Sequence, residues 1–433
     1  MDKQLVVAPA SGRALRGRLR APGDKSISHR ALLVAARAEG RTRIRGLSRG
    51  EDVRHTLEAV VALGAGAERS ERELYIDGGA PRLGEPGAVV DVGNSGTGIR
   101  LLAGFAAAID GLTVLQGDAS VARRPMGRVA VPLRSMGASV DGRQGGRLPP
   151  LVIRGGHLVG IDYELPVASA QVKSAVLFAG LVGSGTTTVR EPVPTRAHTE
   201  EMLAAAGADI EVRPVGAGFS VAVRPSALHA HDIDVPADPS QAAFWAVAAC
   251  ITPGSDLVLE DVYVGRGRAG FLHVLARMGA DLELENEDRA RHTADLHVRS
   301  GPLVATDVRG PEVASLIDEV PVLSVAAAFA EGTTTFSDAS ELRVKETDRV
   351  ATTVELLHSL GGWAEPAPDG LAVTGSGGAP LGPGRVESYG DHRIAMAAAV
   401  AGLGARGPVT VNGWDATATS YPGFEEDLVR CLS

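Results

Sequence analysis

One sequence pattern occurs six times along this chain of 433 residues. A polar and often charged segment opens an Ala/Leu/Val-rich stretch, which ends at a Gly and is followed by a few β-prone residues. The six positions, separated by 71, 74, 69, 78 and 75 residues, are Gly40, Gly111, Gly185, Gly254, Gly332 and Gly407. A fixed period of this kind indicates one supersecondary unit that is used repeatedly.

Each of these Gly residues precedes a segment with strand character. The segments are 42–45, 112–115, 186–189, 255–259, 333–336 and 408–411. In the first five copies a second helix-like stretch follows, and it ends at Gly64, Gly137, Gly207, Gly279 and Gly361. Helix and strand patterns that alternate in this way predict an α/β fold.

The sixth copy is incomplete, because its second helix at 424–432 leaves no sequence for further strands. The first twenty residues have strand character, so we predict that they complete the sixth copy. One discontinuous domain would then contain residues 1–20 and 240–433, and a second would contain residues 21–239, which agrees with the usual size of domains. The alternative is a solenoid of six units, which is less favoured because charged helix starts in nearly every copy would not converge on one place.

The composition excludes several classes of protein. A net charge of −9 argues against a nucleic-acid partner. No apolar run reaches the roughly 18 residues of a membrane span, and residues 1–4 lack the pattern of a signal peptide. Cys250 and Cys431 are the two cysteines and give no disulfide framework, so we expect a cytoplasmic protein. Aromatic residues make up 4% of the chain, which predicts a core of Ala, Val and Leu with Cys250 buried in it.

The first two polar segments suit an anion. Lys25, Ser26 and Arg30 lie at the start of a helix, where free N–H groups and the helix dipole favour negative charge. Segment 93–100 is a glycine loop that allows close backbone approach to a phosphate or carboxylate. The plain alternatives are an ordinary N-cap and an ordinary turn. Just downstream, Arg124 offers a guanidinium suited to bidentate binding of phosphate or carboxylate.

The third and fourth segments differ in their chemistry. Ser169 and Gln171 are suited to hydrogen bonds with hydroxyl or phosphate groups, although simple capping by Ser169 is equally compatible with the sequence. Arg196 begins the next helix and is a further candidate partner for an anion. Segment 238–241 has only capping character, so we assign it no chemistry.

The last two segments contain carboxylates as well as cations. Asp318 and Glu319 precede an apolar helix, where they satisfy its dipole or supply a base near a substrate hydroxyl. Segment 342–349 is dense in opposite charges and could be a solvated salt-bridge ladder. The sixth segment, 390–393, contributes Arg393.

Taken together, these segments predict a ligand with several negative charges. An acidic chain places cations near equivalent helix starts, at Lys25, Arg30, Arg124, Arg196, Lys345, Arg349 and Arg393. Asp318 and Glu346 stand as isolated carboxylates among them and are candidates for proton transfer. The sequence has no HExxH and no Cys/His cluster, so we expect no metal site.

At these residues the sequence resembles the 5-enolpyruvylshikimate-3-phosphate (EPSP) synthase family over essentially its whole length. The motifs are PGDKSISHR (22–30), GNSGTGIR (93–100), RRPM (123–126), ASAQVKSA (168–175), LRVKETDR (342–349) and DHRIAMA (391–397). The resemblance implies two domains, each of three βαβαββ repeats in an inside-out α/β barrel, that close on a substrate cleft. It also implies transfer of the enolpyruvyl group of phosphoenolpyruvate to shikimate 3-phosphate, without metal or organic cofactor and without nucleic-acid or membrane partners. We expect a monomer.

The resemblance also assigns residues position by position. The positions that match the shikimate 3-phosphate site are Lys25, Ser26, Arg30, Ser169, Ala170, Gln171, Arg196, Asp318 and Lys345. Those that match the phosphoenolpyruvate site are Lys25, Asn94, Gly96, Arg124, Gln171, Arg349 and Arg393. The catalytic positions are Asp318, the base near the 5-hydroxyl, Glu346, which handles the proton at C3 of phosphoenolpyruvate, and Lys25.

The chain departs from the family pattern in its C-terminal segment. Many members have a Lys there that binds phosphoenolpyruvate, whereas segment 416–421 offers only Thr417 and Thr419. The common Ser-Ser-Gln is here Ser-Ala-Gln at 169–171, as in the class II subgroup. Some members of that subgroup resist glyphosate through an Ala in the glycine loop. Gly96 occupies that position here, so we predict inhibition by glyphosate.

There are two alternative functions, one a sister enzyme and the other a non-catalytic binding protein. A UDP-N-acetylglucosamine enolpyruvyl transferase shares the architecture but typically carries a reactive Cys, and segment 115–126 contains none. A non-catalytic anion-binding relative would need the cations but neither Asp318 nor Glu346.

Overall fold

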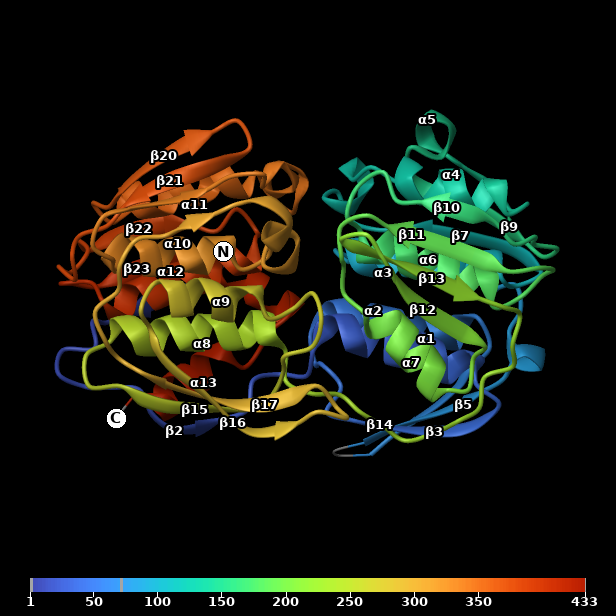
Figure 1. The fold of residues 1–433 in the computed structure, drawn as a ribbon, viewed down its shortest axis with the longest axis horizontal. Helices are drawn as coiled ribbons and strands as arrows, with labels where there is room; N and C mark the ends of the chain where they lie inside the picture. Colours follow the sequence, from blue (N-terminus) through green and yellow to red (C-terminus); the bar gives the residue numbers. More distant parts are fainter. Residues whose placement is uncertain (1–2, 71–72, 433) are drawn as a thin grey trace. The chain divides into compact units, whose positions relative to one another are not determined.

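The structure of the chain is a computed structural model, which describes residues 3–70 and 73–432 (Figure 1). Met1 and Asp2, which belong to the N-terminal segment discussed above, lie outside the described residues. The chain separates into two compact units. Unit 1 contains Met1–Pro22 and Pro236–Ser433, and unit 2 contains Gly23–Val235.

The described part of unit 2 contains three four-stranded sheets of the same design. In each, the strand that follows the repeat Gly pairs antiparallel with one neighbour and parallel with the other. In spatial order they are β14 (Ile233–Asp234), β3 (Gly40–Arg45), β5 (Glu73–Gly78) and β4 (Gly66–Arg69); β6 (Val90–Asp91), β7 (Gly111–Gln116), β9 (Leu148–Gly155) and β8 (Ser139–Gly142); and β10 (Asp162–Glu164), β11 (Thr187–Glu191), β13 (Gly218–Val223) and β12 (Ile210–Val215).

Three further sheets lie in the described part of unit 1. They are β16 (Asp281–Asp288), β17 (Thr293–Arg299), β15 (Asp256–Tyr263) and β2 (Arg16–Leu19); β18 (Asp307–Val308), β19 (Thr333–Phe336), β21 (Gly370–Thr374) and β20 (Trp363–Ala367); and β1 (Gln4–Val7), β23 (Val409–Asn412) and β22 (Gly384–Glu387). All six segments predicted to follow the repeat Gly residues are confirmed as β3, β7, β11, β15, β19 and β23.

The prediction for the N-terminal segment is right for one strand and wrong for the other. β1 pairs antiparallel with β23 and completes the sheet of the sixth copy. β2 instead pairs in parallel with β15 of the fourth copy. The side chains explain the difference, because Leu19 is buried while Arg18 reaches the carboxylates of Glu260 at 2.6 Å and Asp295 at 2.7 Å.

Three helices in each unit are buried along nearly their whole length. They are α1 (Lys25–Arg37), α3 (Gly96–Ala107) and α6 (Ala170–Gly180) in unit 2, and α8 (Pro239–Ile251), α10 (Val320–Phe329) and α12 (His392–Leu403) in unit 1. A helix that is apolar on all sides belongs in a core, and within unit 1 these helices lie between the sheets (Figure 1). Small residues let them approach closely: a Cβ added at Gly104 would lie 2.1 Å from the carbonyl oxygen of Ala175. The predicted core of Ala, Val and Leu is confirmed.

The remaining helices are shorter or more exposed. They are α2 (Glu51–Ala62), α4 (Gly127–Ser135), α5 (Arg143–Gly146), α7 (His198–Ala205), α9 (Gly270–Arg277), α11 (Arg349–Ser359) and α13 (Phe424–Cys431), with short 3-10 helices η1 (Ala80–Arg82), η2 (Val121–Arg123), η3 (Gly310–Ser315), η4 (Ser340–Val344) and η5 (Trp414–Thr419). The Gly residues predicted to end five of them all have positive φ, the conformation that stops a helix at the least cost. No helix within residues 3–70 and 73–432 has both the length and the apolar character needed to span a bilayer.

Cys250 lies in α8 and is 3% exposed, as predicted for a small buried hydrophobic residue. Burial raises the pKa of its thiol to about 12. The thiol therefore stays protonated at neutral pH and is a poor nucleophile.

Tyr421 is the polar centre of an aromatic cluster in unit 1. Its hydroxyl accepts a hydrogen bond from Trp245 Nε1 at 3.1 Å and donates one to Asp427 at 2.6 Å. We expect Tyr421→Phe to lower the free energy of unfolding by about 1–3 kcal/mol, because the buried Trp245 and the partly buried Asp427 lose their bond. Urea unfolding measures this. Tyr389→Phe is the control, since the exposed Tyr389 bonds only Glu355, and equal midpoints for the two variants would contradict the expectation.

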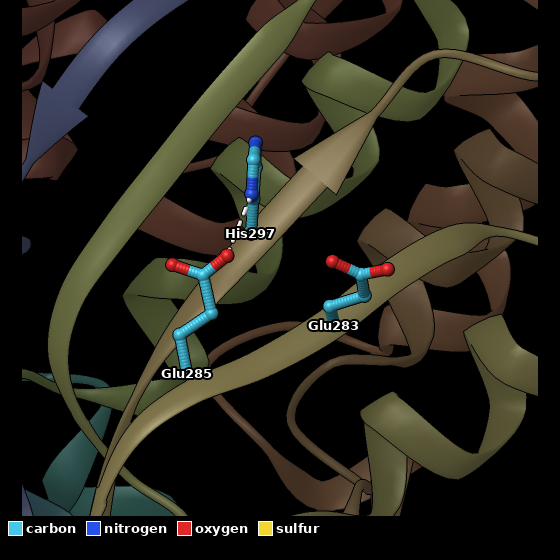
Figure 2. Close-up of side chains that lie close together, drawn as sticks. All are labelled: Glu283, Glu285 and His297. Atoms are coloured by element: carbon cyan, nitrogen blue, oxygen red, sulfur yellow. Dashed lines mark hydrogen bonds and ion pairs between the residues drawn. The ribbon is translucent and has the colours of Figure 1, made fainter.

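A cluster on the sheet of β15, β16 and β17 resembles a metal site at first sight. Glu283, Glu285 and His297 form the one group among the described residues whose ligand atoms all lie within 4.8 Å of one another (Figure 2). Both ring nitrogens of His297 already lie at hydrogen-bond distance from carboxylates, Nε2 at 2.7 Å from Asp256 and Nδ1 at 2.9 Å from Glu285. Arg299 forms an ion pair with Glu283 at 3.4 Å. Cations of the chain itself compensate the carboxylates, so we interpret the cluster as an ion-pair network.

This network predicts a pH-dependent stability. Asp256 and then Glu285 raise the pKa of His297 above its usual value. The stabilisation is therefore fully present below about pH 6.5 and is lost as the pH rises through the raised pKa of the folded state. We expect the difference in unfolding midpoint between the wild type and His297→Gln to shrink as the pH rises from about 5 to about 9. His273→Gln, at an exposed position of α9, is the control, and a difference that grew with pH would refute the assignment.

Candidate active site

The start of α1 brings together three of the predicted residues. Asp24 caps the helix by accepting a hydrogen bond from Ile27 N at 2.7 Å. Ser26 Oγ then accepts one from Arg196 NH1 at 3.0 Å. Lys25 Nζ lies 3.0 Å from the carboxylate of Asp52 in α2. The sequence analysis did not single out Asp52, whose nearest signal was its place in the first turn of α2.

Arg30 is also part of this cluster, but it is 1% exposed. Its guanidinium donates hydrogen bonds to Thr199 Oγ1 at 2.6 Å, Ser174 Oγ at 2.6 Å and the Ser26 carbonyl at 2.8 Å. Arg30 thus ties α1 to α6 and α7 from within the core.

His29 reports the electrostatic character of this region. It is buried in α1, and its Nδ1 lies 2.7 Å from Thr56 Oγ1. Burial, followed by the charges of Lys25 and Arg30, lowers its pKa well below the usual value. The imidazole is therefore neutral at physiological pH. The charges of Lys25 and Arg30, which add to the effect of burial, also favour a bound anion.

The glycine loop wraps around Arg124. Ser95 caps α3 by accepting a hydrogen bond from Gly98 N at 2.8 Å, and Asn94 Oδ1 accepts one from Arg124 NH2 at 3.4 Å. A Cβ at Gly96 would lie 2.1 Å from Arg124 NH1. Only Gly leaves room for the guanidinium in its present position, because the overlap is far below van der Waals contact.

The start of α6 supplies Ser169, Ala170 and Gln171. Ser169 caps the helix, with Val172 N donating to its Oγ at 3.4 Å, and Ala170 is the first residue of the helix. Arg100 NH1 donates to Gln171 Oε1 at 2.6 Å, and Gln171 Nε2 donates to Thr97 at 2.9 Å, so the amide has a fixed orientation.

Arg100 joins three parts of this site and was missed by the sequence analysis. Besides Gln171, it donates to the carbonyl of Gly96 at 3.3 Å and to that of Pro125 at 3.2 Å. It lies inside a motif that was quoted, and its spacing of one helical turn from Gly96 was the available signal.

In unit 1, Arg349 is the centre of the site. This residue is 1% exposed and forms ion pairs with Asp391 at 2.8 Å, Glu346 at 2.6 Å and Asp318 at 3.2 Å. Burial alone would lower its pKa, but the charges of Asp391, Glu346 and Asp318 outweigh burial and raise it. The guanidinium is permanently charged and holds three carboxylates in place.

Two expectations about this region need correction. Asp318 and Glu346 were expected as isolated carboxylates, but both are paired with Arg349, and Asp318 also with Lys345 at 3.1 Å. The alternative of a solvated salt-bridge ladder over 342–349 fails for Arg349, which is buried and bonds residues of other segments. The physical reason is a break in the helix, because η4 ends at Val344 and α11 begins at Arg349.

Arg393 lies at the start of α12, which Asp391 caps through Arg393 N at 2.9 Å. Its NH1 donates to the carbonyl of Asp318 at 2.8 Å and lies 3.5 Å from Glu319 Oε1. Glu319 is 1% exposed and accepts a hydrogen bond from Ser240.

The fourth polar segment has more than the capping role predicted for it. Asp238 caps α8 through Ser240 N at 2.8 Å, as predicted. It also pairs with the buried Arg268 at 2.6 Å, and Arg268 NH1 donates to Ser240 Oγ at 2.9 Å. The segment thereby supports Glu319 beside Arg393.

Segment 416–421 offers no Lys or Arg. It lies in and just after η5, where the hydroxyl of Thr417 donates to the carbonyl of Trp414 at 2.8 Å. Its neighbour Thr419 is 9% exposed. The described residues of this segment therefore supply no substitute for the cation that other members place there.

Comparison with known proteins shows which family this chain belongs to. The sequence profile of "EPSP synthase (3-phosphoshikimate 1-carboxyvinyltransferase)" matches residues 9–428. The chain is 49% identical to the 3-phosphoshikimate 1-carboxyvinyltransferase of Synechococcus sp. (strain JA-3-3Ab), over 99% of this chain and 97% of that protein. It is 48% identical to the enzyme of Gluconobacter oxydans (strain 621H), over 100% and 98% of the two chains.

Solved structures agree. The EPSP synthase of Acinetobacter baumannii superimposes with a TM-score of 0.87 at 42% identity, covering 99% of this chain and 98% of that one. The enolpyruvyl transferase NikO from Streptomyces tendae shares the fold, with a TM-score of 0.77 at 19% identity over 100% and 98% of the chains.

The fold, with three repeats in each unit and cations at the helix starts, is that of an enolpyruvyl transferase. Within that class the chain belongs to the EPSP synthase family. It transfers the enolpyruvyl group of phosphoenolpyruvate to the 5-hydroxyl of shikimate 3-phosphate and releases phosphate. The reaction is a step of the shikimate pathway, which leads through chorismate to the aromatic amino acids.

Proposed function

We propose that the residues at the helix starts of both units act on this one pair of substrates. The observation that carries the proposal is the cluster of Lys25, Ser26 and Arg196 in unit 2, beside His29, whose pKa is lowered by burial and then by the charges of Lys25 and Arg30. Shikimate 3-phosphate would be held there by Lys25, Ser26, Arg30, Ser169, Ala170, Gln171 and Arg196, with Asp318 and Lys345 from unit 1.

Phosphoenolpyruvate, which carries a carboxylate and a phosphate, would be held by cations of both units. Unit 2 would supply Lys25, Asn94, Gly96, Arg124 and Gln171, and unit 1 would supply Arg349 and Arg393. Arg349 is fixed by three carboxylates in unit 1, and Arg124 contacts Asn94 of the glycine loop in unit 2, so each guanidinium is held within its own unit. Charges that need no reorganisation are the most effective in stabilising a transition state.

The carboxylates of unit 1 supply the proton transfers in this proposal. Protonation of phosphoenolpyruvate at C3 through Glu346 makes C2 electrophilic. The 5-hydroxyl then attacks C2 while Asp318 takes its proton, and a tetrahedral intermediate forms. Loss of phosphate, which takes up the proton held by Asp318, and loss of a proton from C3 to Glu346 then give the enol ether. Lys345 and Arg349 fix the Asp318 carboxylate at 3.1 and 3.2 Å.

Phosphate release tests the proposal. The purified protein, with a chelator present, is given phosphoenolpyruvate and either shikimate 3-phosphate or UDP-N-acetylglucosamine. Release with shikimate 3-phosphate alone is expected, and release with the sugar nucleotide would favour the alternative transferase.

The same assay on Arg196→Ala tests the residue assignment, because a phosphate contact from Arg contributes about 1.5–3 kcal/mol. An unchanged KM for shikimate 3-phosphate would overturn that assignment.

We also propose that the protein works as a monomer in the cytoplasm. Both cysteines are free thiols, which supports a reducing compartment. Among the described residues, the large apolar side chains that are exposed are mainly valines from many different parts of the chain, which supports a monomer. Light scattering on the purified protein measures the mass, and a dimer would contradict the proposal.

Gly96→Ala tests the glycine loop. The added methyl group overlaps Arg124 NH1, so the guanidinium must move. We expect the wild type to be inhibited by glyphosate, whose carboxylate and phosphonate need the same cations. In Gly96→Ala, the KM for phosphoenolpyruvate and the inhibition constant for glyphosate should both rise by about tenfold, the equivalent of 1.4 kcal/mol.

Gly127→Ala is the matched control, because a Cβ at Gly127 meets nothing within 4 Å. The measurement is the inhibition constant for glyphosate in the wild type, Gly96→Ala and Gly127→Ala. Full activity of the wild type at millimolar glyphosate would contradict the prediction.

A further inference from the structure

Lys173 lies in α6 and is fully buried, with 0% of its surface exposed. Its ammonium contacts both carboxylate oxygens of Glu191 at 3.0 Å and one oxygen of Glu200 at 2.8 Å. The two glutamates are themselves 1% and 3% exposed. The ammonium of Lys173 is thus taken up by two buried carboxylates, and the sequence alone assigned it no role.

The ammonium joins α6 to the two elements that flank the loop of Arg196, which are β11 and α7. α6 begins with the predicted ligands Ser169 to Gln171, one turn before Lys173. Glu191 ends β11 and holds the loop that contains Arg196, because Glu191 Oε2 accepts hydrogen bonds from Thr195 N at 3.1 Å and Thr195 Oγ1 at 2.6 Å. Glu200 lies in the first turn of α7, directly after that loop.

A second set of bonds shows that this loop is held from both sides. Thr199 in α7 and Ser174 in α6 share a hydrogen bond of 2.6 Å, and both accept from Arg30. Arg196, between Thr195 and Thr199, then reaches Ser26 at 3.0 Å. The loop has its backbone fixed at Thr195 by Glu191, and its following helix fixed by Glu200.

Stability alone does not explain three buried charges. Removing ions from water costs several kcal/mol each, and apolar side chains of similar volume often replace a buried triad without loss of stability. What a charged cluster adds is direction, since its bonds are short and allow few arrangements. Here the direction is transmitted to the loop of Arg196.

We propose that Lys173 is a positioning residue that sets the affinity for the phosphate of shikimate 3-phosphate by fixing Arg196 relative to the start of α6. The proposal rests on the proposed function, in which Arg196 and Ser169 bind that substrate. Lys173 acts through Glu191, Thr195 and Glu200 and takes no part in proton transfer.

The test removes the three charges together and keeps the shapes. In the triple variant Lys173→Met, Glu191→Gln and Glu200→Gln no uncompensated buried charge remains, and the amide at 191 can still accept from Thr195. We expect the KM for shikimate 3-phosphate to rise by about tenfold, with kcat within about twofold and the KM for phosphoenolpyruvate unchanged. Calorimetric binding of shikimate 3-phosphate should weaken by the same factor.

The controls separate positioning from general loss of stability. Leu296→Ala removes buried side-chain atoms from β17 in unit 1, whereas the Lys173 cluster belongs to unit 2. It should lower the unfolding midpoint without changing either KM. If the triple variant does not fold, Glu200→Gln alone keeps the Lys173–Glu191 pair, and it should raise the KM for shikimate 3-phosphate by about threefold, half of the tenfold effect in free energy.

Arg196→Ala distinguishes the two levels of the proposal. An unchanged KM for shikimate 3-phosphate in Arg196→Ala would mean that the ligand assignment itself is wrong. A raised KM in Arg196→Ala together with an unchanged KM in the folded triple variant, or in Glu200→Gln where the triple variant does not fold, would overturn the positioning role of Lys173. Equal loss of affinity for both substrates would also overturn it, because only one substrate depends on this loop.

Discussion

Replacing Glu346 with Gln is expected to lower turnover by about 10²–10⁴-fold, the range for loss of a general acid–base. The amide has nearly the same shape and can still accept a hydrogen bond from Arg349, whose NH2 lies 2.6 Å from Glu346 Oε2. It cannot deliver a proton to C3 of phosphoenolpyruvate or remove one. The affinity for shikimate 3-phosphate should therefore stay within about twofold, as for a change confined to the chemical step.

Two measurements check this prediction: kcat from phosphate release, and the dissociation constant of shikimate 3-phosphate from calorimetry. Glu355→Gln is the matched control, because Glu355 lies on α11, is exposed and bonds only the hydroxyl of Tyr389. Near-normal turnover in Glu346→Gln would remove Glu346 from the proton transfer. A slow variant with equally weakened binding would instead indicate a damaged site.

Replacing Arg349 with Met is expected to be the most damaging single change to the fold. The substitution leaves the carboxylates of Asp318, Glu346 and Asp391 without their shared guanidinium. Removing one partner from a buried ion cluster costs about 3–5 kcal/mol. Turnover should be lost as well, because Arg349 is also a proposed ligand of phosphoenolpyruvate.

Arg349→Lys distinguishes charge from geometry. A single ammonium keeps the charge but lacks the planar fork that reaches three carboxylates at once. We expect Arg349→Lys to recover part of the stability in urea unfolding and little of the turnover. Arg213→Met is the control, because Arg213 is exposed and its pair with Glu211 should contribute at most about 1 kcal/mol. Arg349→Met with wild-type stability would contradict the ion cluster described here.

The repeat made much of the fold predictable. The Gly at the end of each core helix and the strand after it are local signals, and they located β3, β7, β11, β15, β19 and β23. The partner of a short strand is not a local signal. Residues 16–19 were assigned to the wrong sheet for this reason, because their pairing with β15 depends on residues about 240 positions away.

The same distinction holds for the site. Helix starts could be recognised from caps such as Asp24, Ser95 and Asp391, which are short-range features. The bonds that orient the side chains are long-range, as in the contact of Arg30 with Thr199, which spans 169 residues. The role of Lys173 could not be predicted for the same reason. Nothing near Lys173 in the sequence indicates that the carboxylates of Glu191 and Glu200 contact it once β11 and α7 have folded against α6.

The pairing of β1 with β23 has a consequence for the order of events during synthesis. Unit 2 is one continuous stretch, Gly23–Val235, and all its strands are available once that stretch has left the ribosome. β1 is made before unit 2, yet its only sheet neighbour within residues 3–70 and 73–432 is β23, made some four hundred residues later. Domains generally fold as they emerge from the ribosome. We therefore expect unit 2 to fold while β1 is still unpaired. Until β23 has been made, the edges of β1 can pair with other chains.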